Sequence, residues 1–405
     1  MNVLFLTLCD IRDITEHGIY EDLIREFSNN DHNIFVVSPI ERRYKTGTQI
    51  IESNNCHILK VKCGNIQKTN IFEKGIATIR LESILVKAIK KYLCNIKFDL
   101  VIYSTPPITI AKTVELIKKR DNAKTYLLLK DIFPQNAVDL GMMKKHGFLS
   151  LFYHYFRRKE KNLYALSDDI GCMSQANVDY VLRHNPEITR DCVEICPNSI
   201  EPRDMSVSSS IRAAMRKRYG IPQDKIVFVY GGNLGKPQGI SFLIECLKSQ
   251  INNSKVFFLI IGAGTEFNKI EAFVNDNAPA NVKLMCRLPK EDYDQMVGSC
   301  DVGMIFLDYR FTIPNFPSRI LSYMQAKLPV FAVTDKNSDI GNVVSVGGFG
   351  WWCESRNVKN FVAMIDNICR TSNFITMRTA AWEYLQQHYT VNQAYQKIIN
   401  KCRKR

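Results

Sequence analysis

The sequence contains no apolar run that approaches the roughly 18 residues that a membrane-spanning helix requires. Its first nine residues are apolar but lack a basic flank, and Asp10 follows them at once. Such a start predicts a buried strand and no signal peptide. From these two absences we expect a cytoplasmic protein.

Paired metal-binding motifs are also missing. The 13 cysteines are scattered through apolar segments without CxxC spacing, and the seven histidines form no HExxH pattern. Scattered cysteines of this kind are typical of buried, reduced thiols. We therefore predict neither disulfides nor a metal site.

The excess of positive over negative charge lies in one part of the chain. The net charge is +14, and residues 41–161 alone contain 24 Lys and Arg against 10 Asp and Glu, which accounts for all of it. A basic face suits anionic lipid headgroups, nucleic acid or a phosphorylated substrate. The alternative is a set of solvated helix faces without a partner.

The order of apolar and amphipathic segments predicts two α/β domains. Strands alternate with helices between residues 3 and 196, which is typical of a parallel, doubly wound sheet. A polar, Ser-rich linker follows Pro197-Asn198, and the alternation resumes at residue 226. We expect an N-terminal domain at 1–198, a C-terminal domain at 199–380, and a helical segment at 381–405 that could pack on the first domain.

The most informative motif lies at the start of the second half. Apolar residues 226–230 lead into Gly231-Gly-Asn-Leu-Gly-Lys-Pro-Gln-Gly239 and then into a helical segment. A strand, a glycine-rich turn and a helix start are typical of a phosphate cradle, because glycines admit an anion close to free backbone amides. Asn233 and Lys236 have the reach to contact the anion, although Lys236 could equally be a surface lysine.

Two further segments would lie at the same cleft if both sheets point their carboxyl ends inward. Gly18, after His17, stands at a helix start and leaves room for a phosphate, although it could be a plain turn glycine. In the segment 317–320, Ser318 is expected to cap a helix. Arg319 would then stand in the first turn, where a cation is unfavourable unless an anion binds there.

These motifs together resemble a known family. The Gly18 loop, the GGNLGKPQG turn, an IGAG strand end at 261–264 and the PSRILSYMQAKLPV segment resemble the family 4 glycosyltransferases, over essentially the whole chain. The resemblance implies the GT-B fold, two facing Rossmann-like domains. The segments KDIFPQNAVDLGM (130–142) and YSTPP (103–107) further resemble the subgroup that builds bacterial surface polysaccharides, notably the transferases of N-acetylfucosamine.

The resemblance implies a UDP-sugar held mainly by the C-terminal domain and an acceptor held by the N-terminal one. Arg287 would lie at the nucleobase, and residues 317–320 would present backbone amides to the diphosphate. The residues expected to bind the donor are Gly18, Gly232, Asn233, Lys236, Gln238, Arg287, Pro317, Ser318, Arg319, Ile320 and Ser322.

Two departures from the family pattern concern these nucleotide contacts. The family usually has two glutamates eight positions apart in the third segment, where this chain has Pro314 and Ser322. The usual glutamate contact with the ribose is therefore absent at Ser322. Asn233 and Gln238 also occupy the places of the usual cations in the glycine turn, so Arg319 is expected to compensate.

The implied reaction is glycosyl transfer with retention of anomeric configuration, without a cofactor or metal ion. Lys236, Arg319 and helix amides could stabilise the departing nucleoside diphosphate. Asp131, at the end of an apolar strand, is the candidate for contacting the acceptor hydroxyl or the reacting sugar. A cap on the following turn is its structural alternative.

The expected acceptor is a saccharide on a polyprenyl diphosphate, in capsule or O-antigen biosynthesis, with the protein peripheral on the inner face of the cytoplasmic membrane. Exposed apolar residues within 65–93 are expected to enter the lipid. The residues expected at the acceptor or on the anionic membrane surface are His17, Arg157, Arg158 and Lys159.

Two other functions remain open. A nucleotide-sugar 2-epimerase shares the two nucleotide folds but needs acid and base carboxylates in the cleft. A nucleic-acid-binding protein could use the basic face, but the sequence lacks aromatic interleaving and a known module, so we expect no nucleic acid partner.

Overall fold

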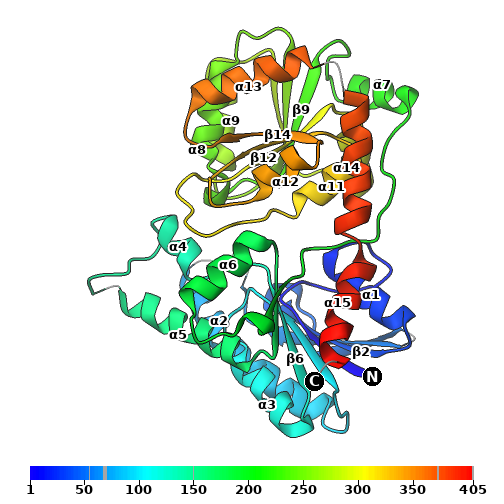
Figure 1. Cartoon of the computed structure of the whole chain (residues 1–405), viewed down its shortest axis with the longest axis vertical. Helices are drawn as coiled ribbons and strands as arrows, with labels where there is room; N and C mark the ends of the chain where they lie inside the picture. The colour runs from blue at the N-terminus through cyan, green and yellow to red at the C-terminus, as the bar shows by residue number, and fades with distance from the viewer. Residues whose placement is uncertain (54, 67–70, 149, 372–373, 404–405) are drawn as a thin grey trace. The chain divides into compact units, whose positions relative to one another are not determined.

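The structure is a computed structural model that describes residues 1–53, 55–66, 71–148, 150–371 and 374–403. The chain divides into two compact units (Figure 1): unit 1 comprises Met1–Glu201 with Val391–Arg405, and unit 2 comprises Pro202–Thr390. Each unit has a sheet covered by helices. The prediction of two α/β, Rossmann-like domains is confirmed.

Unit 1 contains an eight-stranded sheet in the order β3-β4-β2-β1-β5-β6-β7-β8, in which all pairs are parallel except β3 with β4. Its central strands are almost free of solvent, as expected for strands covered on both faces. The strands are β1 (Asn2–Leu6), β2 (Asn33–Glu41), β3 (Gln49–Ser53), β4 (Cys56–Cys63), β5 (Leu100–Ser104), β6 (Lys124–Leu129), β7 (Asp169–Cys172) and β8 (Val193–Ile195).

The helices of unit 1 connect these strands and cover the sheet. The antiparallel strand β3 was not predicted, since it is short and mostly exposed. The helices are α1 (Ile19–Asn29), α2 (Ile71–Tyr92), α3 (Ala111–Asp121), α4 (Gln135–Asp139), α5 (Ser150–Leu166), α6 (Gln175–His184) and α15 (Val391–Arg403).

Unit 2 contains a six-stranded parallel sheet in the order β11-β10-β9-β12-β13-β14. The strands are β9 (Ile226–Asn233), β10 (Val256–Ala263), β11 (Val282–Met285), β12 (Val302–Phe306), β13 (Val330–Thr334) and β14 (Gly350–Glu354). The helices are α7 (Ser209–Arg218), α8 (Ile240–Ser249), α9 (Phe267–Asn277), α10 (Lys290–Gly298), α11 (Arg319–Gln325), α12 (Ile340–Val346), α13 (Val358–Arg370) and α14 (Phe374–His388).

The end of the chain differs from the predicted division at residue 381. Helix α14 runs through that position and stays in unit 2, where the ring of Tyr384 lies 5.1 Å from that of Phe349. Of the last two helices of the chain, only α15 belongs to unit 1. It packs against α1, with the ring of Tyr395 lying edge-on to that of Phe27 at 4.8 Å.

All 13 cysteines are free thiols. Within the described residues, no helix has both the length and the apolar character to cross a membrane.

Candidate functional site

The glycine turn of unit 2 begins later than the sequence indicates. Strand β9 continues through Gly231, Gly232 and Asn233, which pair with residues 261–263 of β10. The turn proper contains a short 3₁₀ segment, Lys236–Gln238, and leads into α8. The two first glycines therefore lie at the carboxyl end of a central strand, which is where parallel sheets bind ligands.

Gly231 and Gly232 allow two large side chains to pack directly on the backbone of β9. A Cβ atom at Gly232 would lie 1.9 Å from Nη2 of Arg319, and one at Gly231 would lie 2.1 Å from Oη of Tyr293. Gly232 also has a φ of +135°, which side-chain-bearing residues rarely adopt. The structure thus brings together Gly232 and Arg319, which lie far apart in the sequence.

Tyr293, on α10, is a member of this group that sequence reasoning missed. Nη1 of Arg319 donates a hydrogen bond to its hydroxyl oxygen at 2.9 Å. Tyr293 stands between two aspartates in the order Asp-x-Asp, a spacing that can bind a metal ion. Here Asp292 accepts a hydrogen bond from Tyr219 at 2.9 Å and pairs with Arg218 at 3.2 Å.

Tyr323, on α11, forms hydrogen bonds through its hydroxyl group with the backbone at the same strand end. Its hydroxyl accepts a hydrogen bond from the amide of Gly231 at 3.3 Å and donates to the carbonyl oxygen of Met304 at 3.0 Å. Burial raises the pKa of Tyr323, so it stays neutral and fixes the backbone of β9.

Asn233 and Gln238 bind each other across the glycine turn. Nδ2 of Asn233 donates to Oε1 of Gln238 at 3.0 Å, and the amide of Gly235 donates to the same oxygen at 3.2 Å. These two side chains therefore stabilise the turn. The side chain of Lys236 is exposed, and no hydrogen bond or ion pair is found for its ammonium group within the described residues, so that group can reach a ligand.

The start of α11 differs in part from prediction. Ser318 occupies the N-cap position, but its side chain makes no capping hydrogen bond, because its backbone is already helical (φ −62°, ψ −13°) where a capping residue is extended. Arg319 is the first helical residue, as predicted. The amide of Ile320 donates to the carbonyl of Pro317 at 3.3 Å, so that amide is already used within the turn.

Two further predicted donor residues are Arg287 and Ser322. Arg287 is exposed in the loop between β11 and α10, and Ser322 is half-buried on α11. Nothing in their contacts indicates a ligand. Their assignment to the nucleobase and the ribose stays a prediction.

In unit 1, Asp131 lies at the carboxyl end of β6, beside Thr105 at the end of β5. Its carboxylate accepts a hydrogen bond from Nδ2 of Asn136 at 2.8 Å, and its amide donates to Oγ1 of Thr105 at 3.2 Å. Burial raises the pKa of Asp131 to about 6, against the hydrogen bonds from Asn136 and the amide of Ile132, which lower it. The group can therefore exchange a proton near neutral pH.

Lys130 precedes Asp131 and is a second perturbed group, which sequence reasoning did not single out. Burial lowers its pKa to about 8, and its Nζ lies 3.5 Å from the carbonyl oxygen of Cys196. Perturbed groups at strand ends are candidates for functional sites.

The start of α1 does not offer the expected room for a phosphate. A Cβ at Gly18 would lie 2.2 Å from Oε2 of Glu21, and the amide of Gly18 lies 3.4 Å from Oδ1 of Asp22. Carboxylates of the chain itself thus stand at the positive end of this helix. The phosphate contact of Gly18 stays a prediction, and an anion bound there would have to displace these carboxylates, which repel it.

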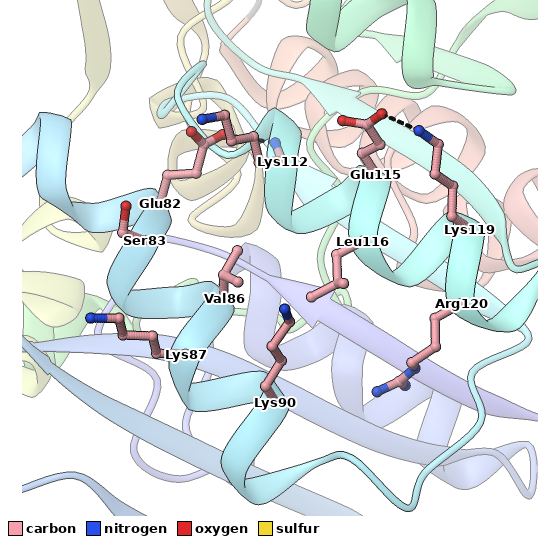
Figure 2. A pocket seen from close by; sticks show the side chains of 10 residues that line it. All are labelled: Glu82, Ser83, Val86, Lys87, Lys90, Lys112, Glu115, Leu116, Lys119 and Arg120. Carbon is pink, nitrogen blue, oxygen red and sulfur yellow. Dashed lines mark hydrogen bonds and ion pairs between the residues drawn. The ribbon is translucent and has the colours of Figure 1, made fainter.

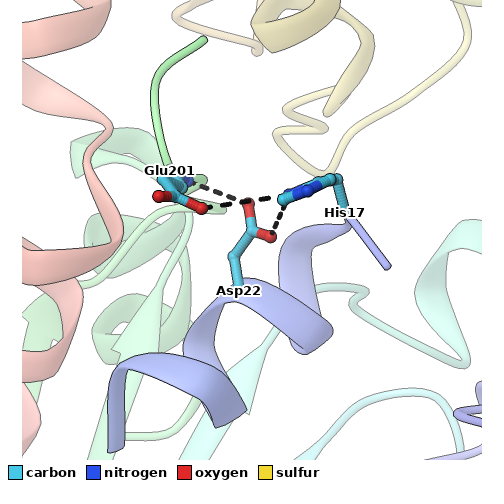
Figure 3. A group of neighbouring side chains, drawn as sticks. All are labelled: His17, Asp22 and Glu201. Carbon is cyan, nitrogen blue, oxygen red and sulfur yellow. Dashed lines mark hydrogen bonds and ion pairs between the residues drawn. The ribbon is translucent and has the colours of Figure 1, made fainter. Parts of the chain in front are cut away.

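His17 belongs to a polar cluster with Asp22 and Glu201 (Figure 3). Their ligand atoms lie within 4.8 Å of one another, the one such group found among the described residues. Arg25 donates to Asp22 at 2.6 Å and to Glu201 at 2.9 Å. Because Arg25 already binds both carboxylates, the cluster is an internal network of unit 1.

Of the three cations expected on the membrane face, Arg157, Arg158 and Lys159, two form contacts within unit 1. Arg157 forms an ion pair with buried Glu160 and donates to Oδ1 of Asn185 at 2.6 Å. Lys159 lies 3.7 Å from Glu82, and only Arg158 of the three points to solvent. The membrane contacts of Arg157 and Lys159 stay predictions, although both side chains already balance buried carboxylates within unit 1.

Most of the apolar residues expected to enter lipid are buried where they can be described. Part of the segment 65–93 lies outside the described residues. On the rest of α2, Leu81, Leu85 and Ile89 are at most 4% exposed, and Leu93, just after the helix, is 5% exposed, while Ile84 and Val86 are half-buried.

Charge reversal distinguishes the internal ion pair of Arg157 from the solvent-exposed position of Arg158 on α5. Arg157→Glu is expected to lower the free energy of unfolding by roughly 3–5 kcal/mol, because Glu160, 2% exposed, would face a like charge. Arg158→Glu should change it by less than about 0.5 kcal/mol. Urea denaturation of both variants measures the difference, and equal stabilities would contradict the burial of this ion pair.

A groove of about 800 Å³ lies between α2 and α3 of unit 1 (Figure 2). Half of its lining is basic, and none of the predicted site residues borders it. Lys119 pairs with Glu115 at 2.5 Å, while Glu82 accepts a hydrogen bond from the amide of Lys112 at 2.7 Å. This groove accounts for part of the basic excess; its cations are Lys87, Lys90, Lys112, Lys119 and Arg120.

Comparison with known proteins identifies the type of enzyme. Residues 211–381, most of unit 2, match the model of the family Glycosyl transferases group 1. WbjE of Pseudomonas aeruginosa, named as a probable glycosyltransferase, is 25% identical over 296 residues, which cover 72% of this chain and 71% of WbjE. WcaI of Escherichia coli K12, named as a colanic acid biosynthesis glycosyl transferase, is 23% identical over 210 residues, 51% and 49% of the two chains.

The fold is that of the GT-B glycosyltransferases. The structure of Anabaena HepE in complex with UDP-glucose superposes with a TM-score of 0.71 at 16% identity, covering 99% of this chain and 98% of that one. Together with the family match, this confirms the predicted fold class and the prediction of a glycosyltransferase.

Proposed function

We propose that the protein moves a sugar from a UDP-sugar to a lipid-linked saccharide, with retention of configuration, in the synthesis of a bacterial surface polysaccharide. The observation that supports it best is the packing of Arg319 and Tyr293 on Gly232 and Gly231, inside the segment that matches the family. HepE binds UDP-glucose and WcaI is named for colanic acid biosynthesis, which supports the donor class and the pathway class.

In this proposal, unit 2 binds the donor and stabilises the departing UDP. Arg319 offers a planar pair of donors to the diphosphate, and Lys236 adds a mobile point charge. The amides of Ser318 and Arg319, at the start of α11, are proposed to add hydrogen-bond donors to the diphosphate. These groups supply the positive charge that the leaving group needs, so the proposed reaction uses no cofactor or metal ion.

The donor sugar and the acceptor are proposed from residues 130–142 and 103–107, which resemble segments of the transferases of N-acetylfucosamine. These segments favour an N-acetylated deoxyhexosamine such as N-acetylfucosamine as the donor sugar. They also favour an acceptor on a polyprenyl diphosphate in capsule or O-antigen synthesis, with the protein peripheral at the inner face of the cytoplasmic membrane.

Asp131 is proposed to contact the acceptor hydroxyl or the reacting sugar. For the wild type, kcat/KM is expected to rise as the pH increases through about 6, because the carboxylate ionises there. Asp131→Asn should lower kcat/KM about 10²-fold or more and remove this step. Asn136→Ala, which removes a hydrogen bond that lowers the pKa, should move the step to higher pH; a step unmoved in both variants would contradict the role.

The reaction is tested by measuring UDP released from UDP-N-acetylhexosamines with and without a polyprenyl-diphosphate-linked sugar. We expect release only when the acceptor is present. Release without any acceptor would favour the 2-epimerase, and salt-dependent DNA binding without any response to nucleotides would favour the nucleic-acid-binding protein.

A further inference from the structure

The beginning of α5 presents a stripe of large apolar side chains to solvent. The exposed fractions are 88% for Phe148, 65% for Leu151, 61% for Phe152 and 44% for Tyr155. Leu151 and Tyr155, at i and i+4 on α5, share one face of the helix with Phe152 beside them, and Phe148 stands just before the helix begins. In Figure 1 the chain between α4 and α5 projects away from the sheet of unit 1.

The part of α5 that follows the stripe already anchors the helix in unit 1. The ring of Phe156 lies edge-on to that of Phe133 at 5.1 Å, and Tyr164 donates a hydrogen bond to Glu160 at 2.8 Å. Leu163 is fully buried. The exposed stripe is therefore additional to the part of α5 that the fold uses, and clustered apolar side chains on a surface indicate an interaction site.

Basic residues border the stripe along the chain. Residues 140–159 contain five Lys or Arg and no Asp or Glu. Lys144 is exposed, Lys145 lies 5.5 Å from the centre of the Tyr153 ring, and exposed Arg158 follows Tyr155 by one turn of the helix. Apolar side chains rimmed by cations match the boundary between acyl chains and anionic headgroups.

We propose that this surface, the α5 patch, docks the protein on an anionic lipid bilayer. The α5 patch comprises Phe148, Leu151, Phe152 and Tyr155 with Lys144, Lys145 and Arg158. The aromatic and leucine side chains enter the interface while the cations contact phosphate groups of the lipids. The inference rests on the proposed function in that a lipid-linked acceptor makes a bilayer the partner, and it replaces the membrane face expected from the sequence.

Sedimentation of the full chain with lipid vesicles tests the docking. Wild-type protein is expected to bind vesicles that contain phosphatidylglycerol much more tightly than vesicles of phosphatidylcholine alone. The double variant Phe148→Ser/Phe152→Ser should bind at least tenfold more weakly. Val346→Ser/Ile375→Ser, which removes side chains 77% and 82% exposed in unit 2, is the matched control and should bind like the wild type.

A second double variant, Lys144→Glu/Arg158→Glu, tests the charge and should lose the preference for phosphatidylglycerol. Wild-type binding by Phe148→Ser/Phe152→Ser would overturn the proposal, as would loss of binding in the control pair. A second copy of the chain is the other possible occupant of the patch, and sedimentation velocity detects it. If the wild type forms a dimer that only Phe148→Ser/Phe152→Ser disrupts, and if it binds no vesicles, the patch is a self-association surface and the proposal is overturned.

Thermal stabilisation by UDP, measured on the same proteins, separates this inference from the proposed function. Stabilisation by UDP without vesicle binding would overturn the docking surface and leave the transferase in place. Vesicle binding that depends on the patch, without stabilisation by UDP, would support the surface and contradict the donor.

Discussion

Arg319→Ala is expected to lower the rate of sugar transfer about 10²- to 10³-fold and to abolish stabilisation by UDP. The guanidinium lies on the bare backbone of Gly232 and is held by Tyr293 at 2.9 Å, so it is oriented before any ligand arrives. A group fixed in this way stabilises developing charge without reorganising during the reaction. Steady-state kinetics with a UDP-sugar, together with UDP titrations, measures both effects.

Three further variants define what Arg319 contributes. Arg319→Lys keeps the charge but loses the planar fork, and should recover only a small part of the activity. Lys236→Ala should be milder, because that exposed cation is not held in place. Arg370→Ala, an exposed arginine at the end of α13, is the control and should behave as the wild type. A larger loss with Lys236→Ala than with Arg319→Ala would contradict the proposed division of roles.

Gly232→Ala is expected to lower the free energy of unfolding by about 1–3 kcal/mol and to abolish UDP binding. The new Cβ would lie 1.9 Å from Nη2 of Arg319, and the φ of +135° is strained for any side chain. The guanidinium must therefore leave its place or the strand end must shift. Urea denaturation and UDP titration measure the two consequences separately.

Gly348→Ala is the matched control for the backbone strain. Gly348 also lies in unit 2 with a positive φ of +66°, but no atom lies within 4 Å of an added Cβ. This variant should lose some stability and keep UDP binding. If Gly232→Ala binds UDP as the wild type does, the contact between Gly232 and Arg319 has no part in donor binding.

The strands could be predicted from the sequence, because strand, turn and helix start are local patterns. The proximity of the glycine turn to Arg319 could be expected from the common edge at which parallel strands end and from the family resemblance. Tyr293 could not, since its place beside Arg319 depends on how α10 packs against the sheet. No spacing in the sequence relates residue 293 to residue 319. The same holds for Tyr323, whose hydroxyl binds the backbone of β9.

The charged residues show a second limit. The pair Arg157 and Glu160 has the i, i+3 spacing of a helical ion pair, which is visible in the sequence, but its burial is not. At Gly18, the adjacent Glu21 and Asp22 are acids in a first helical turn, which the helix dipole favours. That signal was present, and it indicated that the helix start was already neutralised.

The α5 patch shows the opposite limit of sequence-based prediction, because its spacing indicates burial while its side chains are exposed. Phe148, Leu151, Phe152 and Tyr155 have a helical period that normally indicates a core-facing stripe. Leu163 continues this spacing further along the helix and is buried, whereas Phe152 is exposed. Only the packing of unit 1 decides which part of the helix is covered.

Thermal unfolding in the presence of UDP, GDP and ADP is the most direct test of UDP-sugar-dependent transfer. UDP should raise the unfolding temperature progressively with its concentration, corresponding to about 2.7 kcal/mol at one hundred times its Kd, and GDP and ADP should have smaller effects. No shift with any of the three nucleotides would contradict the proposed donor and with it the proposed reaction.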